Sequence, residues 1–413
     1  MIYVLIGILL IFYFSFSKYS ISRILTLLYL FSLLANFFIG TYSLNEGLLL
    51  QLFYVLWVGL VLFLIISPWN KYKIINSIDN VDYKKLLLFV KIVGTICIFM
   101  TVGCFILGHA IHNVVEDIDG FKYRGGQEEI LGALNISTKP YLLAYALYPL
   151  SYFFIPLIFY YISKKKYALS VWCFISSLTS VAFGYAYFSR SHTTHYVLLV
   201  ISTYWLYRGL FPYKIRKRIV YLGLSLISVS IISFMAISFA RFEDHGYAFK
   251  KNDALIQNPV AYSLMDYYGM WWYEGAAVTS DYSFSNFNGQ LSLQSVSKFI
   301  NITSFGTISL NDGELQRKRE ALLKEHYGTF IGVSSYFLYD FGIFISLIIL
   351  LIYYNLTKRR SPIHNKISLS NAMQIVILIQ LPLFGIFYST LDVIILMYVY
   401  WAIIRFCFKK NSI

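Results

Sequence analysis

Three short segments of this 413-residue chain place arginine close to histidine, and two of them also hold carboxylates. They read YFSRSHTTHY (187–196), ARFEDHG (240–246) and ELQRKREALLKEHYG (314–328). A planar guanidinium group suits phosphate, to which it donates two parallel hydrogen bonds. Histidine titrates near neutral pH and therefore suits the removal of a proton from a hydroxyl group. The candidate phosphate-binding residues are Arg190, Arg241, Arg317 and Arg319; the candidate bases are His326 and then His245, with Glu243 to orient an imidazole or to act as a base itself.

Residues 313–326 are predicted to form a helix with Asp312 at its N-cap position. At helical spacing Arg319 and His326 share a face with two leucines, so a guanidinium and an imidazole would lie along the same side. That arrangement would aim both groups at one substrate. A surface helix of mixed charge would give the same string of residues.

Two further candidates for substrate contacts lie outside these segments. Arg124 sits beside a Gly125-Gly126 turn in a segment, 109–140, that also holds five acidic residues. Those acids could bind a cation or supply a base, although a solvated loop would have the same composition. Asp340 lies inside an apolar run, where a carboxylate is costly and usually faces a cavity or a partner. Its partner would be either substrate or a structural Tyr or Arg.

The segment YSLMDYYGMWWYEGAA (262–277) is dense in aromatic residues. Aromatic faces with neighbouring polar groups can stack on sugar rings. Trp and Tyr also favour the depth of lipid headgroups, so an amphipathic helix lying in the membrane interface is an equal alternative.

The elements that position these residues are predicted to be membrane-spanning helices. The chain is 58% hydrophobic and 13% charged, whereas a soluble domain carries roughly 25% charged residues. Apolar runs of about 17–23 residues recur, and that length crosses a bilayer as a helix. We predict an all-α polytopic membrane protein, one integral domain over 1–413, with a smaller external loop at 109–140 and a large one at about 240–330 that contains short helices. The eleven predicted spans lie near 1–17, 24–41, 48–68, 86–108, 141–162, 168–188, 194–211, 219–239, 331–354, 371–388 and 392–408.

Basic residues predict the orientation of these spans. In an eleven-span arrangement most of the 34 Lys and Arg fall in connections on one side, beside only two acids, Asp79 and Asp82. By the positive-inside rule that side is the cytoplasm, which puts the amino terminus outside and the carboxyl terminus inside. The net charge of +14 is then a topology signal and indicates no nucleic-acid partner. The first apolar run has no basic segment before it, so we expect a retained helix and not a cleaved signal peptide.

No metal or other cofactor is expected from the sequence. All four cysteines, Cys97, Cys104, Cys173 and Cys407, lie in apolar spans. No CxxC motif or Cys/His cluster suggests a metal site.

The architecture and two local segments resemble the oligosaccharide repeat-unit polymerases of bacterial envelopes, the O-antigen polymerase (Wzy) family. Ser189-Arg190-Ser191 is similar to a Ser-Arg turn that recurs in O-antigen polymerases and ligases. YGTFIGVSSYFLYDFG (327–342) is similar to the aromatic-Asp-Phe-Gly stretch that follows the large loop in repeat-unit polymerases. The overall resemblance, ten to twelve or so spans with a large external loop in the second half, covers nearly the whole chain.

The resemblance implies a glycosyltransferase whose partners are undecaprenyl-diphosphate-linked oligosaccharides, together with a chain-length regulator and a flippase. A growing glycan would leave its lipid carrier for the non-reducing sugar of a newly arrived repeat unit at the periplasmic face of the inner membrane. Arginines would then stabilise the departing diphosphate, and a histidine would deprotonate the acceptor hydroxyl.

Three other classes of protein remain open at this point. An O-antigen ligase uses the same donor but delivers the glycan to lipid A–core. A flippase or transporter for lipid-linked oligosaccharide would be expected to show internal repeats, mid-span charges and short loops. A membrane scaffold without an active site would not need clustered external Arg and His. The Asp-Phe-Gly stretch favours the polymerase over the ligase.

Overall fold

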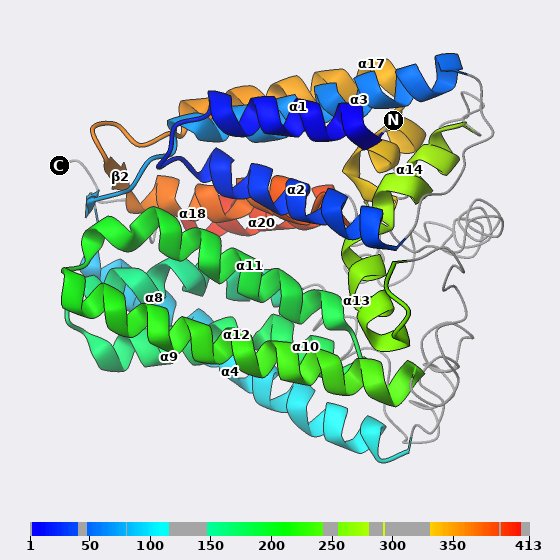
Figure 1. Ribbon diagram of the computed structural model, residues 1–413. Coiled ribbons are helices and arrows are strands. Elements are labelled where there is room, and N and C mark those ends of the chain that lie inside the picture. The colour runs from blue at the N-terminus through cyan, green and yellow to red at the C-terminus, as the bar shows by residue number, and fades with distance from the viewer. Residues whose placement is uncertain are drawn as a thin grey trace, which may run out of the picture.

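The computed structural model describes residues 2–39, 48–79, 81–114, 147–242, 255–280, 292–293, 331–387 and 390–405. The chain is mostly helical and forms an elongated bundle in which successive long helical segments run in opposite directions, with α9 and α10 counting as one segment (Figure 1). The α-helices that run along the bundle are α1 (Ile2–Ser15), α2 (Ile21–Phe38), α3 (Leu48–Ile66), α4 (Tyr83–His112), α8 (Phe154–Ser163), α9 (Tyr167–Ser177), α10 (Thr179–Ala186), α11 (Arg190–Tyr207), α12 (Tyr213–Phe242), α17 (Gly332–Arg359), α18 (Leu369–Leu378) and α20 (Leu391–Ile404). The other helical elements are η1 (Ser67–Lys71), η2 (Tyr148–Phe153), η3 (Arg208–Leu210), α13 (Pro259–Gly269), α14 (Trp271–Ser280) and α19 (Gln380–Phe384).

Five helical segments among the described residues are long and apolar enough to cross a bilayer: Ile21–Phe38, Leu49–Lys71, Tyr83–His112, Tyr167–Ala186 and Gly332–Arg359. Wherever they are described, all eleven predicted spans are helical over most of their length. Several of them are divided; for example, η2 precedes α8, α9 meets α10 at Leu178, and α18 meets α19 at Ile379. The ends also differ from those predicted, because polar residues at 213–218 and 355–359 continue α12 and α17.

The prediction of an all-α fold needs one correction. Strand β1 (Ser77–Asp79) pairs in parallel with β2 (Lys366–Ser368), with Ile78 opposite Ile367. Both strands belong to connections between helices and are only three residues long. Hydropathy gave no sign of them, because such a short pairing depends on bringing two distant connections together.

Hydrogen bonds join the basic connections at one end of the bundle. The Ile21 amide donates to the Tyr72 carbonyl at 3.0 Å, and the Ile75 amide to the Leu206 carbonyl at 2.8 Å. The Asn76 amide donates to Asn365 O at 2.8 Å, beside the β1–β2 pair. We call this end, formed by connections 16–20, 67–82, 164–166, 208–212 and 360–368, the basic end; it lies on the left of Figure 1.

The opposite end holds α13 and α14, on the right of Figure 1. The last residues of α2, α4 and α12 and the first residues of η2, α11 and α17 also lie there. The Leu255 amide donates to Phe38 O at 3.1 Å, which ties the segment before α13 to the end of α2. We call this the loop end.

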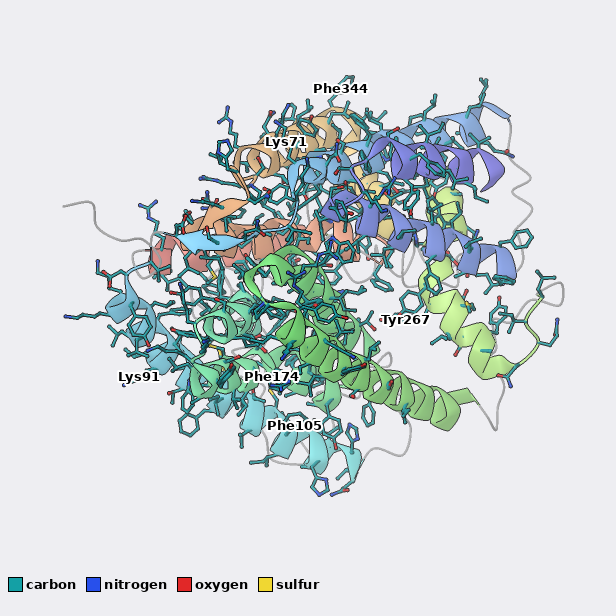
Figure 2. All side chains as sticks on the ribbon, turned by 60° about the vertical axis from the view of Figure 1, so that its left-hand side comes forward. Lys71, Lys91, Phe105, Phe174, Tyr267 and Phe344 are labelled. Carbon is teal, nitrogen blue, oxygen red and sulfur yellow. The ribbon has the colours of Figure 1, made fainter. Side chains whose placement is uncertain are left out.

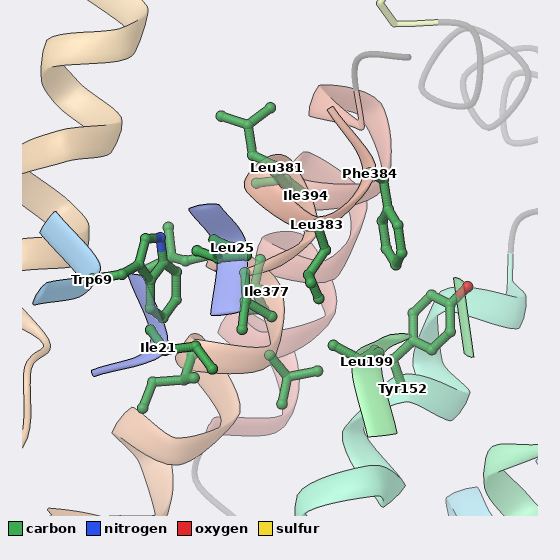
Figure 3. Packing of buried hydrophobic residues seen from close by; sticks show 14 of the residues in the cluster. Ile21, Leu25, Trp69, Tyr152, Leu199, Ile377, Leu381, Leu383, Phe384 and Ile394 are labelled. Carbon is green, nitrogen blue, oxygen red and sulfur yellow. The ribbon is translucent and has the colours of Figure 1, made fainter. Parts of the chain in front are cut away.

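Apolar side chains face both inward and outward. The centre of the bundle is α18 and α19, which lie between Ile21, Leu25 and Trp69 on one side and Tyr152 and Leu199 on the other (Figure 3). On the outside, Phe344 of α17 is 82% exposed and Phe99 of α4 is 74% exposed. Figure 2 shows Phe344 and Phe105 on outer surfaces at opposite sides of the bundle. A soluble protein would rarely expose so much apolar surface, whereas a bilayer covers it.

Candidate functional site

The structure positions three of the nine predicted site residues. Arg190 is the first residue of α11, Arg241 is the penultimate residue of α12, and both therefore lie at the loop end; Asp340 lies in the first third of α17. The remaining predicted site residues lie outside the described residues: Arg124, Glu243, His245, Arg317, Arg319 and His326. So do most of the acidic segment 109–140 and the predicted helix 313–326.

Arg190 follows a reversal of the chain in only three residues between α10 and α11. Phe188 takes a left-handed conformation with φ 49°, and the Ser189 amide donates to the Gly184 carbonyl at 2.7 Å. Gly184 allows the turn to close this tightly. A Cβ atom at Gly184 would lie 2.8 Å from His192 Cβ and 2.9 Å from Ser189 O.

We therefore expect Gly184→Ala to push the 189–192 turn away from α10 and to destabilise the protein by about 1–3 kcal/mol. Thermal unfolding of the purified protein measures this effect. Gly103→Ala in α4 is the matched control, because nothing lies within 4 Å of a Cβ atom there. Equal melting temperatures for the two variants would contradict the packing described.

The Ser189 hydroxyl is used within the turn. It lies 2.8 Å from the Ser191 hydroxyl and 3.0 Å from His192 Nδ1, and it makes no capping hydrogen bond to α11. The positive end of the helix dipole therefore coincides with Arg190, the first residue of α11. An anionic group is favoured at such a position.

Aromatic rings join this turn to the end of α4 and to η2. The His112 ring stacks on Phe188 with 3.9 Å between centroids, and His112 Nε2 lies 2.9 Å from Tyr185 O. The His192 ring meets Tyr148 of η2 edge-on at 5.4 Å. The turn that carries Arg190 is thus fixed from two sides.

Phe384 and Phe387 connect the same turn to the large segment after α12. His195 of α11 is buried and stacks on Phe384, with ring centroids 3.5 Å apart. Phe387 lies 6.1 Å from the His195 ring and 5.1 Å from Tyr267 of α13. The start of α11 and the helices of the large segment therefore meet around one aromatic cluster at the loop end.

Asp340 anchors the large segment to α17. Its side chain is fully buried, and Oδ2 accepts a hydrogen bond of 2.6 Å from the Ser292 amide. Two residues later Gly342 breaks the helix with φ 65° and ψ −178°, a conformation that only glycine adopts readily. The Ser346 hydroxyl donates to the Phe337 carbonyl at 2.7 Å across this kink. The Asp-Phe-Gly stretch therefore has a structural role: Asp340 binds the Ser292 amide and Gly342 bends α17. From the sequence, the partner of Asp340 could have been either substrate or another part of the protein.

The aromatic segment 262–277 forms α13 and α14, and its tryptophans do not offer exposed faces. Trp271 and Trp272 are each 1% exposed, and both indole N–H groups donate to the Ser32 hydroxyl, at 2.6 and 3.1 Å. Ser32 in turn donates to Tyr268 O at 2.6 Å. Neither the sugar-stacking nor the interfacial interpretation holds for these two residues, because they pack into the core against α2.

Sequence reasoning did not select two buried carboxylates of the same segment, Asp266 and Glu274. Each is 2% exposed, and Asp266 Oδ1 accepts a hydrogen bond of 2.9 Å from the Tyr273 hydroxyl. The sequence feature that could have identified them is that they are acidic residues in a segment made mostly of aromatic and small residues. Within the described ranges, no group of three or more His, Cys, Asp or Glu is placed to hold a metal ion.

No protein-family model, curated protein or solved structure matches this chain.

Proposed function

We propose that this chain is an inner-membrane polymerase of undecaprenyl-diphosphate-linked oligosaccharide repeat units, acting at its loop end on the periplasmic side. The observation that carries the proposal is the position of Arg190. It begins α11 at the end opposite the basic connections, and the same helix meets α13 of the large segment through His195, Phe387 and Tyr267. The product is O-antigen, capsule or another surface polysaccharide.

The proposal includes eleven membrane crossings, with the amino terminus in the periplasm and the carboxyl terminus in the cytoplasm. The alternating helix directions and the joining of the basic connections at one end support this topology. The two ends of α4 offer a direct check, since Lys84 and Asn113 are both exposed.

We expect a cysteine at Asn113 to react in intact spheroplasts with a maleimide that cannot cross membranes. A cysteine at Lys84 should react only after the membrane is permeabilised. Cys97, Cys104 and Cys173 are buried and should contribute little background. The reverse labelling pattern would overturn the proposed orientation.

The proposed reaction transfers the growing glycan. The acceptor hydroxyl attacks the anomeric carbon, the bond from that carbon to the diphosphate oxygen breaks, and undecaprenyl diphosphate leaves. Arg190 and the positive end of α11 stabilise the charge that grows on the diphosphate. Arg241, Arg317, Arg319 and Arg124 are further candidates for contacts with the diphosphate or glycan. The acceptor proton goes to His326, or to His245 with Glu243 beside it.

Asp340 contributes to this scheme by holding the large segment in place through Ser292. The energy is already present in the glycosyl phosphate bond, so neither ATP nor a nucleotide sugar is consumed at this face. Chain length would be set with a partner regulator, and a flippase would deliver the repeat units.

The surface glycan banding pattern of a deletion strain tests the proposal. Polymerase function predicts loss of the ladder with survival of a band that carries core plus one repeat unit, because ligation continues. Complementation with the wild-type chain should restore the ladder, and complementation with Arg190→Ala should not. Loss of every glycan-bearing band would point to a ligase or flippase, and an unchanged ladder would reject the proposal.

A further inference from the structure

The basic end contains a pair of arginines, Arg208 and Arg216, that form no salt bridge in the part of the chain that the structure describes. Arg208 is the C-cap residue of α11, and Arg216 lies in the first turn of α12, just across a short connection. Within the described residues, the single salt bridge joins Lys85 and Asp82 at 3.7 Å. Neither arginine takes part in it.

Arg208 is held against aromatic rings. Its Cζ atom lies 3.6 Å from the centroid of the Trp205 ring, which is close for a cation over an indole. Tyr19, Tyr204 and Arg216 are the groups close enough to act on its charge. The Tyr204 hydroxyl of α11 donates to the Arg216 carbonyl at 3.5 Å, which holds the start of α12 beside the end of α11. Tyr19 belongs to the connection between α1 and α2, which lies at the same end of the bundle.

Arg216 is oriented by the backbone. Its Nε donates to the Phe211 carbonyl at 2.7 Å. The Arg216 side chain makes no other hydrogen bond to the described residues. The terminal nitrogens of the guanidinium group thus remain available to another acceptor. Arg216 is exposed and Arg208 half-buried.

A nearby hydrogen-bond donor also lacks an acceptor among the described residues. The Trp205 indole N–H is buried without a hydrogen-bond partner among the described residues. No acidic residue stands in the first turn of α12, where several cations follow one another. Two guanidinium groups that act on each other's charge, and that form no salt bridge with any described carboxylate, are an arrangement that an anion would stabilise.

We infer that Arg208 and Arg216 form a binding site for a phosphate group at the cytoplasmic surface of the membrane, and that its occupant is the headgroup of an anionic phospholipid. Two guanidinium forks match phosphate oxygens, and Trp205 and Tyr19 suit the depth at which headgroups lie. The site lies at the end of the bundle opposite Arg190, so it rests on the proposed orientation of the bundle but not on the proposed transfer reaction.

Three lysines at the basic end differ from this pair. Lys164 lies over Tyr160, Lys166 over Tyr83 and Lys358 over Tyr354, each as a single lysine with its own ring. A lysine ammonium is a point charge and cannot make the paired contact of a guanidinium. The inferred specificity therefore belongs to the arginine pair and not to the general positive charge of this end.

Native mass spectrometry of the full chain in detergent, titrated with phosphatidylglycerol, tests the inference. We expect binding of phosphatidylglycerol to be about tenfold weaker in Arg208→Gln/Arg216→Gln than in the wild type. Lys84→Gln/Lys164→Gln removes the same charge elsewhere at the basic end and should bind nearly as the wild type does. Arg216→Gln alone, at an exposed position, should fold normally and bind several-fold more weakly.

A parallel titration with inorganic phosphate distinguishes the two sources of phosphate. Binding of phosphatidylglycerol alone, lost in the arginine variant, supports the lipid headgroup as occupant. Binding of inorganic phosphate with similar strength, also lost in that variant, keeps the phosphate site and overturns the lipid assignment. Equal lipid affinities for the wild type and the arginine variant, or equal losses in the arginine and lysine variants, would overturn the inference.

Discussion

Arg190→Ala is expected to lower the rate of glycan polymerisation by about 100-fold or more while the protein stays folded. Arg190 begins α11 at the loop end, where the helix dipole already favours an anion. Removal of its charge withdraws stabilisation from the leaving diphosphate, and this stabilisation matters most in the transition state. The measurement is the single-turnover rate of glycan lengthening in membranes that contain equal amounts of each variant.

Two further variants refine the Arg190 result. Arg190→Lys keeps the charge but loses the paired hydrogen bonds, so it should recover only part of the rate. Lys84→Ala removes an exposed cation at the opposite end of the bundle and should keep the wild-type rate. If Arg190→Ala polymerises as fast as Lys84→Ala, Arg190 has no role in the transfer.

Ser32→Ala is expected to destabilise the protein by about 2–4 kcal/mol, because two buried indole N–H groups lose their acceptor. The Ser32 hydroxyl accepts hydrogen bonds from the indole N–H groups of Trp271 and Trp272 and donates one to the Tyr268 carbonyl. Its loss should loosen α13 and α14 from α2 in particular. Thermal unfolding reports the overall effect, and hydrogen exchange reports whether α13 and α14 lose protection first.

The control for Ser32 is Ser225→Ala. That hydroxyl donates to Tyr221 O at 3.0 Å on an exposed face of α12, so its removal should change stability little. Uniform loss of protection across the bundle in Ser32→Ala would show that the serine stabilises the fold generally. That result would contradict the expectation that α13 and α14 loosen from α2 first.

The helices could be predicted from the sequence because hydropathy acts along the chain. Runs such as LLLQLFYVLWVGLVLFLII in α3 are apolar at nearly every position and must satisfy their backbone hydrogen bonds internally in a bilayer. The distribution of Lys and Arg likewise identified the connections that share one end. Two of those connections prove to be hydrogen-bonded to one another, through the Asn76 amide and the Asn365 carbonyl.

The tertiary contacts could not be predicted in this way. Trp271 and Trp272 look like surface aromatics in sequence, and only the position of Ser32, more than two hundred residues earlier, explains their burial. Asp340 was found as an anomaly within an apolar run, but its contact with the Ser292 amide depends on how the large segment folds back. Hydropathy predicts which residues lie in the membrane, but it does not predict which residues far apart in the sequence contact one another.

Reconstitution of the purified chain tests the central claim most directly. The protein would be placed in liposomes with lipid-linked repeat units extracted from the deletion strain, without nucleotide sugar, ATP or lipid A–core. Mass spectrometry would then measure the number of repeat units per lipid and the undecaprenyl diphosphate released. We expect lipid-linked chains of two or more units and one undecaprenyl diphosphate released per bond formed, with both lost in Arg190→Ala. Unchanged single-unit lipids, or glycan transfer only when lipid A–core is added, would contradict it.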